Sequence, residues 1–430
     1  MSPKTLSVYE HGSLRVAPGQ LSQSQLDALA RFNDAHQQRY FRLGHQRIIA
    51  SSFVGYIQVG KLGIEIFPKL DRNTTDARHG TLWQSFLLEM LRVSLGLQLH
   101  SPTSGARALG RPTLLDLVAL RFVTEVERLL HEGLAKGYRA VESNGSTFRG
   151  RLLPAAHARA NAARADRFYV RYATFDRDIL INRVLATALE VLRHQSLSNP
   201  VRVRVGAAEG LFPEVSGGPA TAEDCDRITL TRSTHRYREA LTLARMILQH
   251  RAPDLRGGAH EVFAVLFNMN VLWESYVGWL FRRAAPPGCD VLLQEARPFW
   301  QPRPGGPRKV RPDVVLRDRA TGHVLLIADA KWKALEGATP DDDHLKQMFV
   351  YNHLFQADQA VLIHPTASQG QRRLSGVYLD RDHRCGTAEI GLFDAARLRP
   401  EDMIAQMKEL LVAVQRTVPS TSVLAGASGT

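Results

Sequence analysis

Three charged residues interrupt two short apolar runs in the stretch RPDVVLRDRATGHVLLIADAKWK, residues 311–333. Asp313 opens the first run, and Asp329 and Lys331 close the second. Residues two apart on a strand project from the same face, so Asp329 and Lys331 should share one, with Asp313 beside them across a strand pair. Two neighbouring carboxylates repel each other unless a cation lies between them.

A divalent metal ion between the two carboxylates would offset this repulsion. Mg²⁺ (or Mn²⁺) binds a few carboxylates, a backbone carbonyl and several waters. A lysine beside it could orient or help deprotonate an attacking water, while the metal lowers the pKa of that water and stabilises charge on a phosphate. The pattern therefore predicts a metal-dependent phosphodiesterase. The alternative is an ordinary hairpin end with charges in solvent, because so short a motif often arises by chance.

Three features of the surrounding sequence favour the metal site. Glu274 is a lone acid on a largely apolar predicted helix. The run HVLLIAD indicates a buried strand, which places Asp329 at the strand's mouth. On the helix that follows, Gln347 and Tyr351 lie one turn apart on one face and could point toward DNA or toward the lysine.

These elements, in this order, resemble the PD-(D/E)XK nuclease superfamily, and Gln347-x-x-x-Tyr351 resembles the Q-x-x-x-Y element of its RecB-like branch. More narrowly, the chain resembles the McrC family, the nuclease subunits of 5-methylcytosine-specific McrBC-type restriction systems used in phage defence. The resemblance extends over most of the length. It is carried by GYIQVGKLGIEIFPKL, LVALRFVTEVERLLHEGLAKGYRAVESNGSTFRGRL, FDRDILINRVLATALEVL (with Asp178 and Asn182 as its polar points) and FNMNVLWESYVGWLF.

The resemblance implies roles for individual residues. Asp313 and Asp329 would be the metal-binding acids, helped by the backbone carbonyl of Ala330 and, more loosely, by Glu274. Lys331 would be the catalytic lysine, supported by Gln347 and Tyr351.

The resemblance also implies a partner, an McrB-like AAA+ GTPase that this subunit would stimulate within a hetero-oligomeric complex. The chain contains no GxxxxGK[ST] motif, so it should not hydrolyse nucleotide itself. In the family the β-rich N-terminal part meets the GTPase, so YIQVGKLGIE (residues 56–65) is the predicted contact, although such a hairpin is equally a structural element.

Hydrophobic periodicity predicts an α/β protein, α+β overall, with a β-rich N-terminal domain, a helical middle region and a C-terminal nuclease domain. The nuclease domain should hold a mixed central sheet flanked by helices. The stretch 260–285 reads as one helix that opens this domain. The expected boundaries are 1–100, 101–258 and 259–417, followed by a disordered tail over 418–430.

The composition favours a polyanionic partner. The formal net charge is +13, and lysine and arginine gain binding energy by displacing counterions from phosphate. Double-stranded DNA is the predicted partner, with a solvated basic surface as the alternative. RPGGPRKVR (303–311) is the better candidate for a DNA contact, because it leads directly into the predicted site. HARANAARADRFYVRY (157–172) is the weaker one, since a solvated helix face also explains it.

The three cysteines lie far apart, and neither an apolar signal segment nor a long apolar run is present. We therefore expect a cytoplasmic protein with no membrane association and without disulfides. Two other functions stay open alongside the restriction endonuclease. One is a non-catalytic adaptor that activates the AAA+ ring, and the other is a stand-alone RecB-like DNA repair nuclease.

Overall fold

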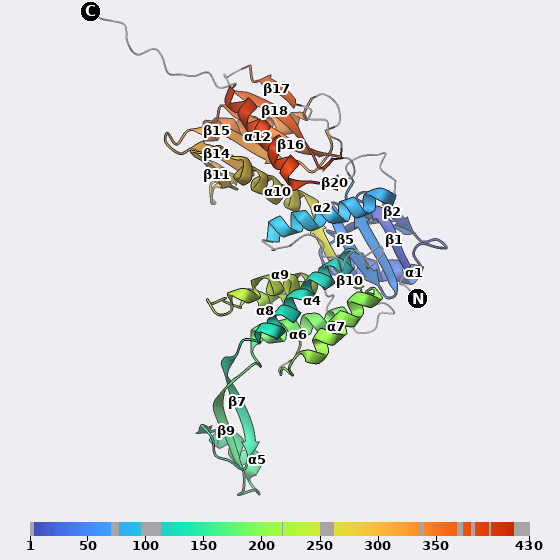
Figure 1. Cartoon of the computed structure of the whole chain (residues 1–430), viewed down its shortest axis with the longest axis vertical. Coiled ribbons are helices and arrows are strands. Elements are labelled where there is room, and N and C mark those ends of the chain that lie inside the picture. The colour runs from blue at the N-terminus through green and yellow to red at the C-terminus, as the bar shows by residue number, and fades with distance from the viewer. Residues whose placement is uncertain are drawn as a thin grey trace, which may run out of the picture.

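The computed structural model describes residues 4–69, 77–95, 113–216, 218–249, 262–335, 339–367, 373–379, 383–394 and 397–416. The predicted domain ends near residues 100 and 258 and the predicted tail 418–430 lie outside these ranges. Helices and mixed sheets make up the described part of the chain, which confirms the predicted α+β organisation (Figure 1). Among the described helices, none is long and apolar enough to cross a bilayer.

A four-stranded sheet, in the order β1-β6-β5-β10, forms the centre of the N-terminal part. β1 and β6 run parallel, and β5 is antiparallel to both β6 and β10. β10 is contributed by the chain that follows the helical region, so it closes the helical region back onto the first sheet (Figure 1). The bounds are β1 Lys4–Tyr9, β5 Phe53–Val59, β6 Leu62–Phe67 and β10 Val262–Asn268.

One face of this sheet is covered by a helix and a smaller sheet, and together they form one apolar cluster. The helix was not expected in a β-rich region. It begins with a capping box: the Ser22 hydroxyl accepts from the backbone amide of Gln25, and the Gln25 side-chain oxygen accepts from the backbone amide of Ser22. The elements are α1 Gln23–Ala35, β2 Ser13–Arg15, β3 Phe41–Gly44 and β4 Arg47–Ala50, with the small sheet in the order β2-β4-β3.

The other face packs against helices that share a second, larger apolar cluster. Phe122 and Val126 on α4 and Leu185 on α6 are fully buried there, and Tyr56 of β5 joins them from the sheet. The cluster continues into the C-terminal part, so all three regions share buried surface. The helices are α2 Ala77–Leu95, α4 Leu114–Glu132, α6 Leu180–Arg193, α7 Asn199–Leu211, α8 Ala222–Asp226, η1 His235–Tyr237 and α9 Arg238–Gln249.

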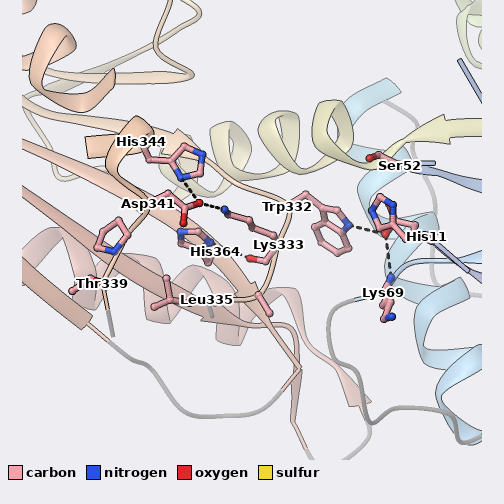
Figure 2. A pocket seen from close by; sticks show the side chains of 13 residues that line it. His11, Ser52, Lys69, Trp332, Lys333, Leu335, Thr339, Asp341, His344 and His364 are labelled. Carbon is pink, nitrogen blue, oxygen red and sulfur yellow. Dashed lines mark hydrogen bonds and ion pairs between the residues drawn. The ribbon is translucent and has the colours of Figure 1, made fainter. Parts of the chain in front are cut away.

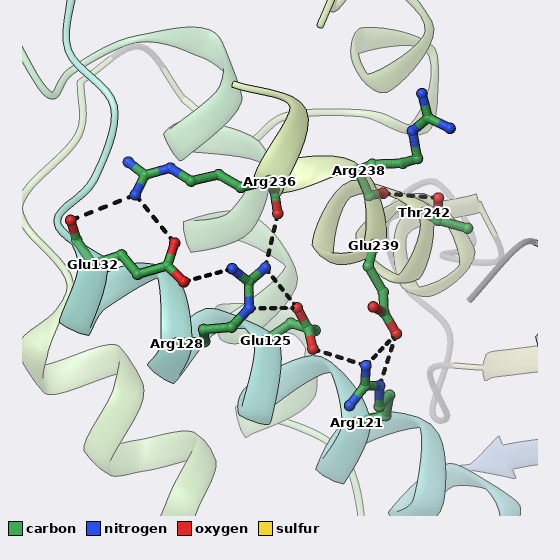
Figure 3. Close-up of polar contacts among 8 residues, drawn as sticks. All are labelled: Arg121, Glu125, Arg128, Glu132, Arg236, Arg238, Glu239 and Thr242. Carbon is green, nitrogen blue, oxygen red and sulfur yellow. Dashed lines mark hydrogen bonds and ion pairs between the residues drawn. The ribbon is translucent and has the colours of Figure 1, made fainter. Parts of the chain in front are cut away.

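Alternating charges join two of these helices along their polar edge (Figure 3). Arg121 of α4 lies between Glu125 of its own helix and Glu239 of α9. Arg128 then binds Glu125 and Glu132, each at 2.8 Å. Because Glu125 is buried and paired on both sides, this network accounts for an acid within the helical packing.

A three-stranded sheet projects from the helical region at one end of the molecule (Figure 1). Its order is β7-β9-β8, and Tyr138 and Phe175 form a cross-strand ring pair 4.9 Å apart while remaining 80% and 56% exposed. The middle region is therefore helical with an added β projection. The bounds are β7 Gly137–Gly145, β8 Arg151–Leu152, α5 Pro154–Asn161 and β9 Phe168–Asp176.

The C-terminal part contains a six-stranded mixed sheet in the order β11-β14-β15-β16-β18-β17. β15, β16 and β18 run parallel and the other pairings are antiparallel. Helices α10 and α12 cover one face, and α11 covers the other. The bounds are α10 Met269–Ala284, β11 Cys289–Leu293, β14 Val314–Asp318, β15 Val324–Ala330, α11 Asp342–Phe355, β16 Gln359–Thr366, β17 Arg373–Val377, β18 Arg384–Gly391 and α12 Pro400–Arg416. Two small hairpins complete it, β12 Arg297–Trp300 with β13 Arg308–Val310, and β19 Phe393–Asp394 with β20 Arg397–Leu398.

The prediction of one helix over 260–285 is wrong in its first part. Residues 262–268 form β10 in the N-terminal sheet, and helix α10 begins only at Met269, with Asn268 as its N-cap. A continuous apolar run fits a buried strand as well as a buried helix. Here the run pairs with the edge of β5 and therefore forms a strand. The segment therefore starts as part of the N-terminal sheet and ends as the first helix of the C-terminal part.

Asn182 offers a test of this packing, because its fully buried amide donates to the carbonyls of Ala135 and Arg177 and accepts from the Tyr237 hydroxyl at 3.1 Å. Asn182→Ala should lower the free energy of unfolding by about 1–3 kcal/mol, since it leaves buried polar groups without partners. Urea denaturation measures the loss. Asn270→Ala, at an exposed position, should stay within about 0.5 kcal/mol of the unaltered protein, and equal losses in the two variants would contradict the assignment.

Candidate active site

The antiparallel pair β14–β15 brings the two predicted acids together. Val314 pairs with Ala328, so Asp313, which precedes β14, lies across from the end of β15. Its Oδ2 accepts from the backbone amide of Ala330 at 2.7 Å. Asp313 and Asp329 are only 9% and 4% exposed. The predicted hairpin, including the placement of Asp313 beside the end of the second strand, is therefore confirmed.

Asp313 has a second partner that the sequence did not reveal. Gln294, which directly follows β11, donates from its side chain to Asp313 Oδ1 at 2.8 Å and from its backbone amide to the Asp313 carbonyl at 3.1 Å. Its φ of 55° is left-handed, a conformation that costs free energy in a residue other than glycine. The two contacts with Asp313 hold Gln294 in this conformation, so β11 orients the carboxylate from one side and β15 from the other.

Lys331 links the second acid to helix α11. Its Nζ lies 2.6 Å from Asp329 Oδ2, which confirms that the two side chains share one face, and it donates to Gln347 Oε1 at 3.1 Å. The Gln347 amide in turn donates to the Tyr351 hydroxyl at 2.8 Å, and this hydroxyl donates to the Arg311 carbonyl. Gln347 therefore contacts the lysine, which was one of the two predicted directions, and Tyr351 is linked to the lysine through Gln347.

Glu274 approaches from helix α10. Its side chain is partly buried, and burial followed by the charge of Asp329 raises its pKa, against a lowering effect of Lys331. The structure thus places Glu274 within electrostatic reach of the acid and the lysine. Metal binding by the Ala330 carbonyl stays a prediction, because the contact that bears on the site is the hydrogen bond from the Ala330 amide to Asp313.

Burial and the repulsion between neighbouring carboxylates dominate the electrostatics of the site. Burial raises the pKa of Asp313 to about 7, and the charges of Asp329 and Glu274 add to the effect. The hydrogen bonds from Ala330 and Gln294 act in the opposite direction without cancelling it. Lys331 is the one lysine or arginine in an ion pair with these three acids among the described residues. Three acids with a single lysine leave a local excess of negative charge.

This donor set suits a hard divalent cation with few protein ligands. Within the described residues, no three His, Cys, Asp or Glu side chains converge closely enough to form a complete metal cage. Mg²⁺ does not need one, because it is commonly held by one or two carboxylates, with waters and substrate phosphate completing the shell. A carboxylate that accepts one hydrogen bond at each oxygen keeps free lone pairs, so Asp313 and Asp329 could both still bind a metal.

The residue after the lysine anchors this strand end to the N-terminal sheet. The indole Nε1 of Trp332 donates to Glu10 Oε2 at 3.0 Å, and its ring packs against Trp83, Phe86 and Trp273. Glu10 is almost fully buried, and burial raises its pKa to about 7. Neither Glu10 nor Trp332 was expected to take part, since they come from opposite ends of the sequence.

A cavity of about 360 Å³ lies beside this anchor, between the N-terminal sheet and the start of α11 (Figure 2). Lys333 and His344 meet Asp341 on one side, and Glu10 with Trp332 lies on the other. His364 lines the cavity too, and burial lowers its pKa to about 4. The cavity adjoins the strand end that carries Asp329 and Lys331, but it does not contain those two side chains.

Comparisons with known proteins settle the family. The sequence model described as "McrBC 5-methylcytosine restriction system component" matches residues 48–365. The chain belongs to this family. The match covers strands β5, β6 and β10 of the N-terminal sheet, the helical region and the strands with Asp313 and Asp329, and it confirms the resemblance seen in the sequence.

One solved structure supports the fold. The chain is similar to a structure described as a refined half-complex from a tetradecameric assembly of Thermococcus gammatolerans McrB AAA+ hexamers with bound McrC, with a TM-score of 0.68 at 19% identity, covering 95% of this chain and 100% of that one. A second structure, of the Thermococcus gammatolerans McrBC complex, matches with a TM-score of 0.46 at 18% identity, covering 66% of this chain and 89% of that one. No curated protein matches.

The raised pKa of Asp313 predicts a pH-dependent stability. A carboxyl whose pKa is higher in the folded protein stabilises the fold below its unfolded pKa, near 4, and loses that contribution as the pH rises through about 7. In EDTA, Asp313→Asn should therefore gain stability over the unaltered protein as the pH rises from about 4 to 8, by an amount on the order of a few kcal/mol. Thermal denaturation at a series of pH values measures this difference. A difference that stays constant with pH would refute it, and Asp318→Asn at the end of β14 serves as the control because its pKa is lowered.

Proposed function

We propose that this chain is the DNA endonuclease subunit of a modification-dependent, McrBC-type restriction system and hydrolyses phosphodiesters with Mg²⁺ (or Mn²⁺) in a PD-(D/E)XK site. The observation that carries the proposal is the Asp329–Lys331 ion pair beside the buried Asp313. A purely structural hairpin gains nothing from burying two neighbouring acids, because each loses its hydration. A site that must bind a cation and a phosphate requires them.

Each side chain of the candidate site has its own role in the proposed hydrolysis. Asp313 and Asp329 would hold the cation, and Glu274 would add negative charge from α10. When bound, the cation lowers the pKa of a water and offsets the charge that develops on the phosphate. Lys331 stands beside Asp329, where its ammonium group can orient the attacking water and meet the phosphate. Gln347 and Tyr351 keep the lysine at this point.

The reaction is a hydrolysis. The water oxygen forms a bond to phosphorus as one phosphorus–oxygen ester bond breaks, and the departing sugar oxygen takes up a proton. No electron acceptor is required. Lys331 forms an ion pair with Asp329, so it also offsets negative charge at the site before the phosphate arrives.

We also propose an AAA+ GTPase of the McrB kind as the partner in a hetero-oligomer. The Thermococcus structure, described as McrB AAA+ hexamers with bound McrC, supports this because the present chain aligns with all of the matched chain. The predicted contact through residues 56–65 needs revision, since β5 and β6 are buried strands in the interior of a sheet. Their connecting turn at Gly60–Lys61 is the part left for such a contact.

The non-catalytic adaptor and the stand-alone repair nuclease make different predictions. An adaptor would stimulate the GTPase but would not cut DNA when the site is intact. A stand-alone nuclease would cut without partner or nucleotide. The complete set of Asp313, Asp329 and Lys331, with its supporting side chains, favours catalysis over the adaptor.

Removal of the lysine tests the mechanism. Lys331→Ala should reduce Mg²⁺-dependent cleavage of methylated plasmid, in the presence of the AAA+ partner and GTP, by at least about 100-fold. Asp313→Ala and Asp329→Ala should do the same, while all three proteins still bind the partner and stimulate its GTPase. Lys346→Ala, on the exposed side of α11, should cut normally. Undiminished cutting by Lys331→Ala protein would overturn the mechanism.

A further inference from the structure

The segment that leads into Asp313 forms a two-stranded hairpin, β12–β13. Arg297 pairs with Val310 and Trp300 pairs with Arg308, and the turn runs through residues 301–307. Asp313 follows β13 after two further residues. Whatever this hairpin binds will therefore lie close to the candidate active site.

The base of the hairpin is fixed to helix α11. Arg297 donates to the Leu354 carbonyl at 2.9 Å, and its guanidinium lies 4.2 Å from the centre of the Phe355 ring. The Arg311 carbonyl accepts from the Tyr351 hydroxyl, which also binds Gln347. The hairpin is thus attached to the same helix that positions Lys331, and its outer end points away from this anchor.

The hairpin carries only positive charge. Residues 297–311 contain five arginines and lysines and no aspartate or glutamate. Four of the five are exposed and form no ion pair with any described residue, whereas Arg121, Arg128 and Arg204 of the helical region each pair with a glutamate. These four are Arg303, Arg308, Lys309 and Arg311.

Two large aromatic side chains stand among these cations. Phe299 and Trp300 are 50% and 52% exposed, and the Arg308 guanidinium lies 5.5 Å from the centre of the Trp300 ring. Half-exposed side chains of this size that belong to none of the three apolar clusters indicate a binding surface. Unpaired cations interleaved with aromatic rings match a nucleic acid, which offers phosphates to the first and base or sugar faces to the second.

We propose that the β12–β13 hairpin binds the substrate DNA duplex next to the phosphodiester bond that is cut. Arg303, Arg308 and Lys309 bind backbone phosphates, and Trp300, supported by Arg308, packs against a sugar or base in the groove. This inference rests on the proposed nuclease function, since it takes DNA as the substrate. It adds a positioning surface that places the backbone opposite Asp313 and Lys331.

The test measures binding of the full-length chain to a fluorescein-labelled duplex of about 30 base pairs, with Ca²⁺ in place of Mg²⁺ so that binding is observed without cleavage. Fluorescence anisotropy over a series of salt concentrations gives both affinity and its salt dependence. The triple variant Arg303→Ala/Arg308→Ala/Lys309→Ala should bind more weakly, and the slope of log K against log salt should fall in magnitude by about 2–3, since each lost phosphate contact contributes about 0.9.

The aromatic contact has a different signature. Trp300→Ala should weaken binding by at least about five-fold at every salt concentration and leave the slope unchanged, because it removes stacking and no charge. Trp300→Phe should recover most of the affinity. All these positions are exposed, so the thermal unfolding of the variants should match that of the unaltered protein.

A matched control removes three exposed cations from separate elements, Arg232→Ala/Arg282→Ala/Lys346→Ala, and should bind like the unaltered chain. Equal losses in both triple variants would overturn the proposal in favour of a general charge effect. So would normal DNA binding by the hairpin variants together with lost binding to the AAA+ partner, which would make the hairpin a protein contact. Failure of the nuclease proposal is distinguishable, because the binding measurement does not depend on cleavage.

Discussion

Two like charges, on Asp313 and Asp329, are buried at the same end of one strand pair, and the surrounding structure is arranged to tolerate them. The Ala330 amide and the Gln294 side chain bind the first carboxylate, and Lys331 pairs with the second. These contacts reduce the repulsion without removing it, so burial and the neighbouring charges still raise the pKa of Asp313. Two neighbouring buried carboxylates of this kind are suited to hold a cation between them.

The strand end that carries Lys331 is held by parts of the chain far from it in sequence. Trp332 turns away from the lysine into an aromatic cluster and donates to Glu10 of the N-terminal part, while the Lys331 amide donates to the Ile363 carbonyl of β16. That carbonyl also accepts from the indole of Trp273, next to Glu274 on α10. The N-terminal sheet, α10 and β16 therefore fix one strand end together.

The sequence was sufficient to predict those parts of the candidate site that depend on local geometry. Alternation along a strand placed Asp329 and Lys331 on one face, and helical spacing placed Gln347 and Tyr351 together. The partners that depend on the fold were not accessible in this way. Gln294 reaches Asp313 only because β11 pairs with β14, and Glu10 meets Trp332 only because two distant segments pack together. The strand Val262–Asn268 looked like helix because an apolar run alone does not reveal which edge it will join.

Direct measurement of metal binding tests the central claim, that Asp313 and Asp329 together hold a divalent cation. Titration of Mn²⁺ into the full-length chain, followed by electron paramagnetic resonance of the free ion, counts the bound ions. The account predicts saturable binding that is lost in Asp313→Asn/Asp329→Asn and kept in Asp341→Asn/Asp342→Asn, two acids on the exposed start of α11. Equal binding by both double variants and the unaltered chain would contradict it.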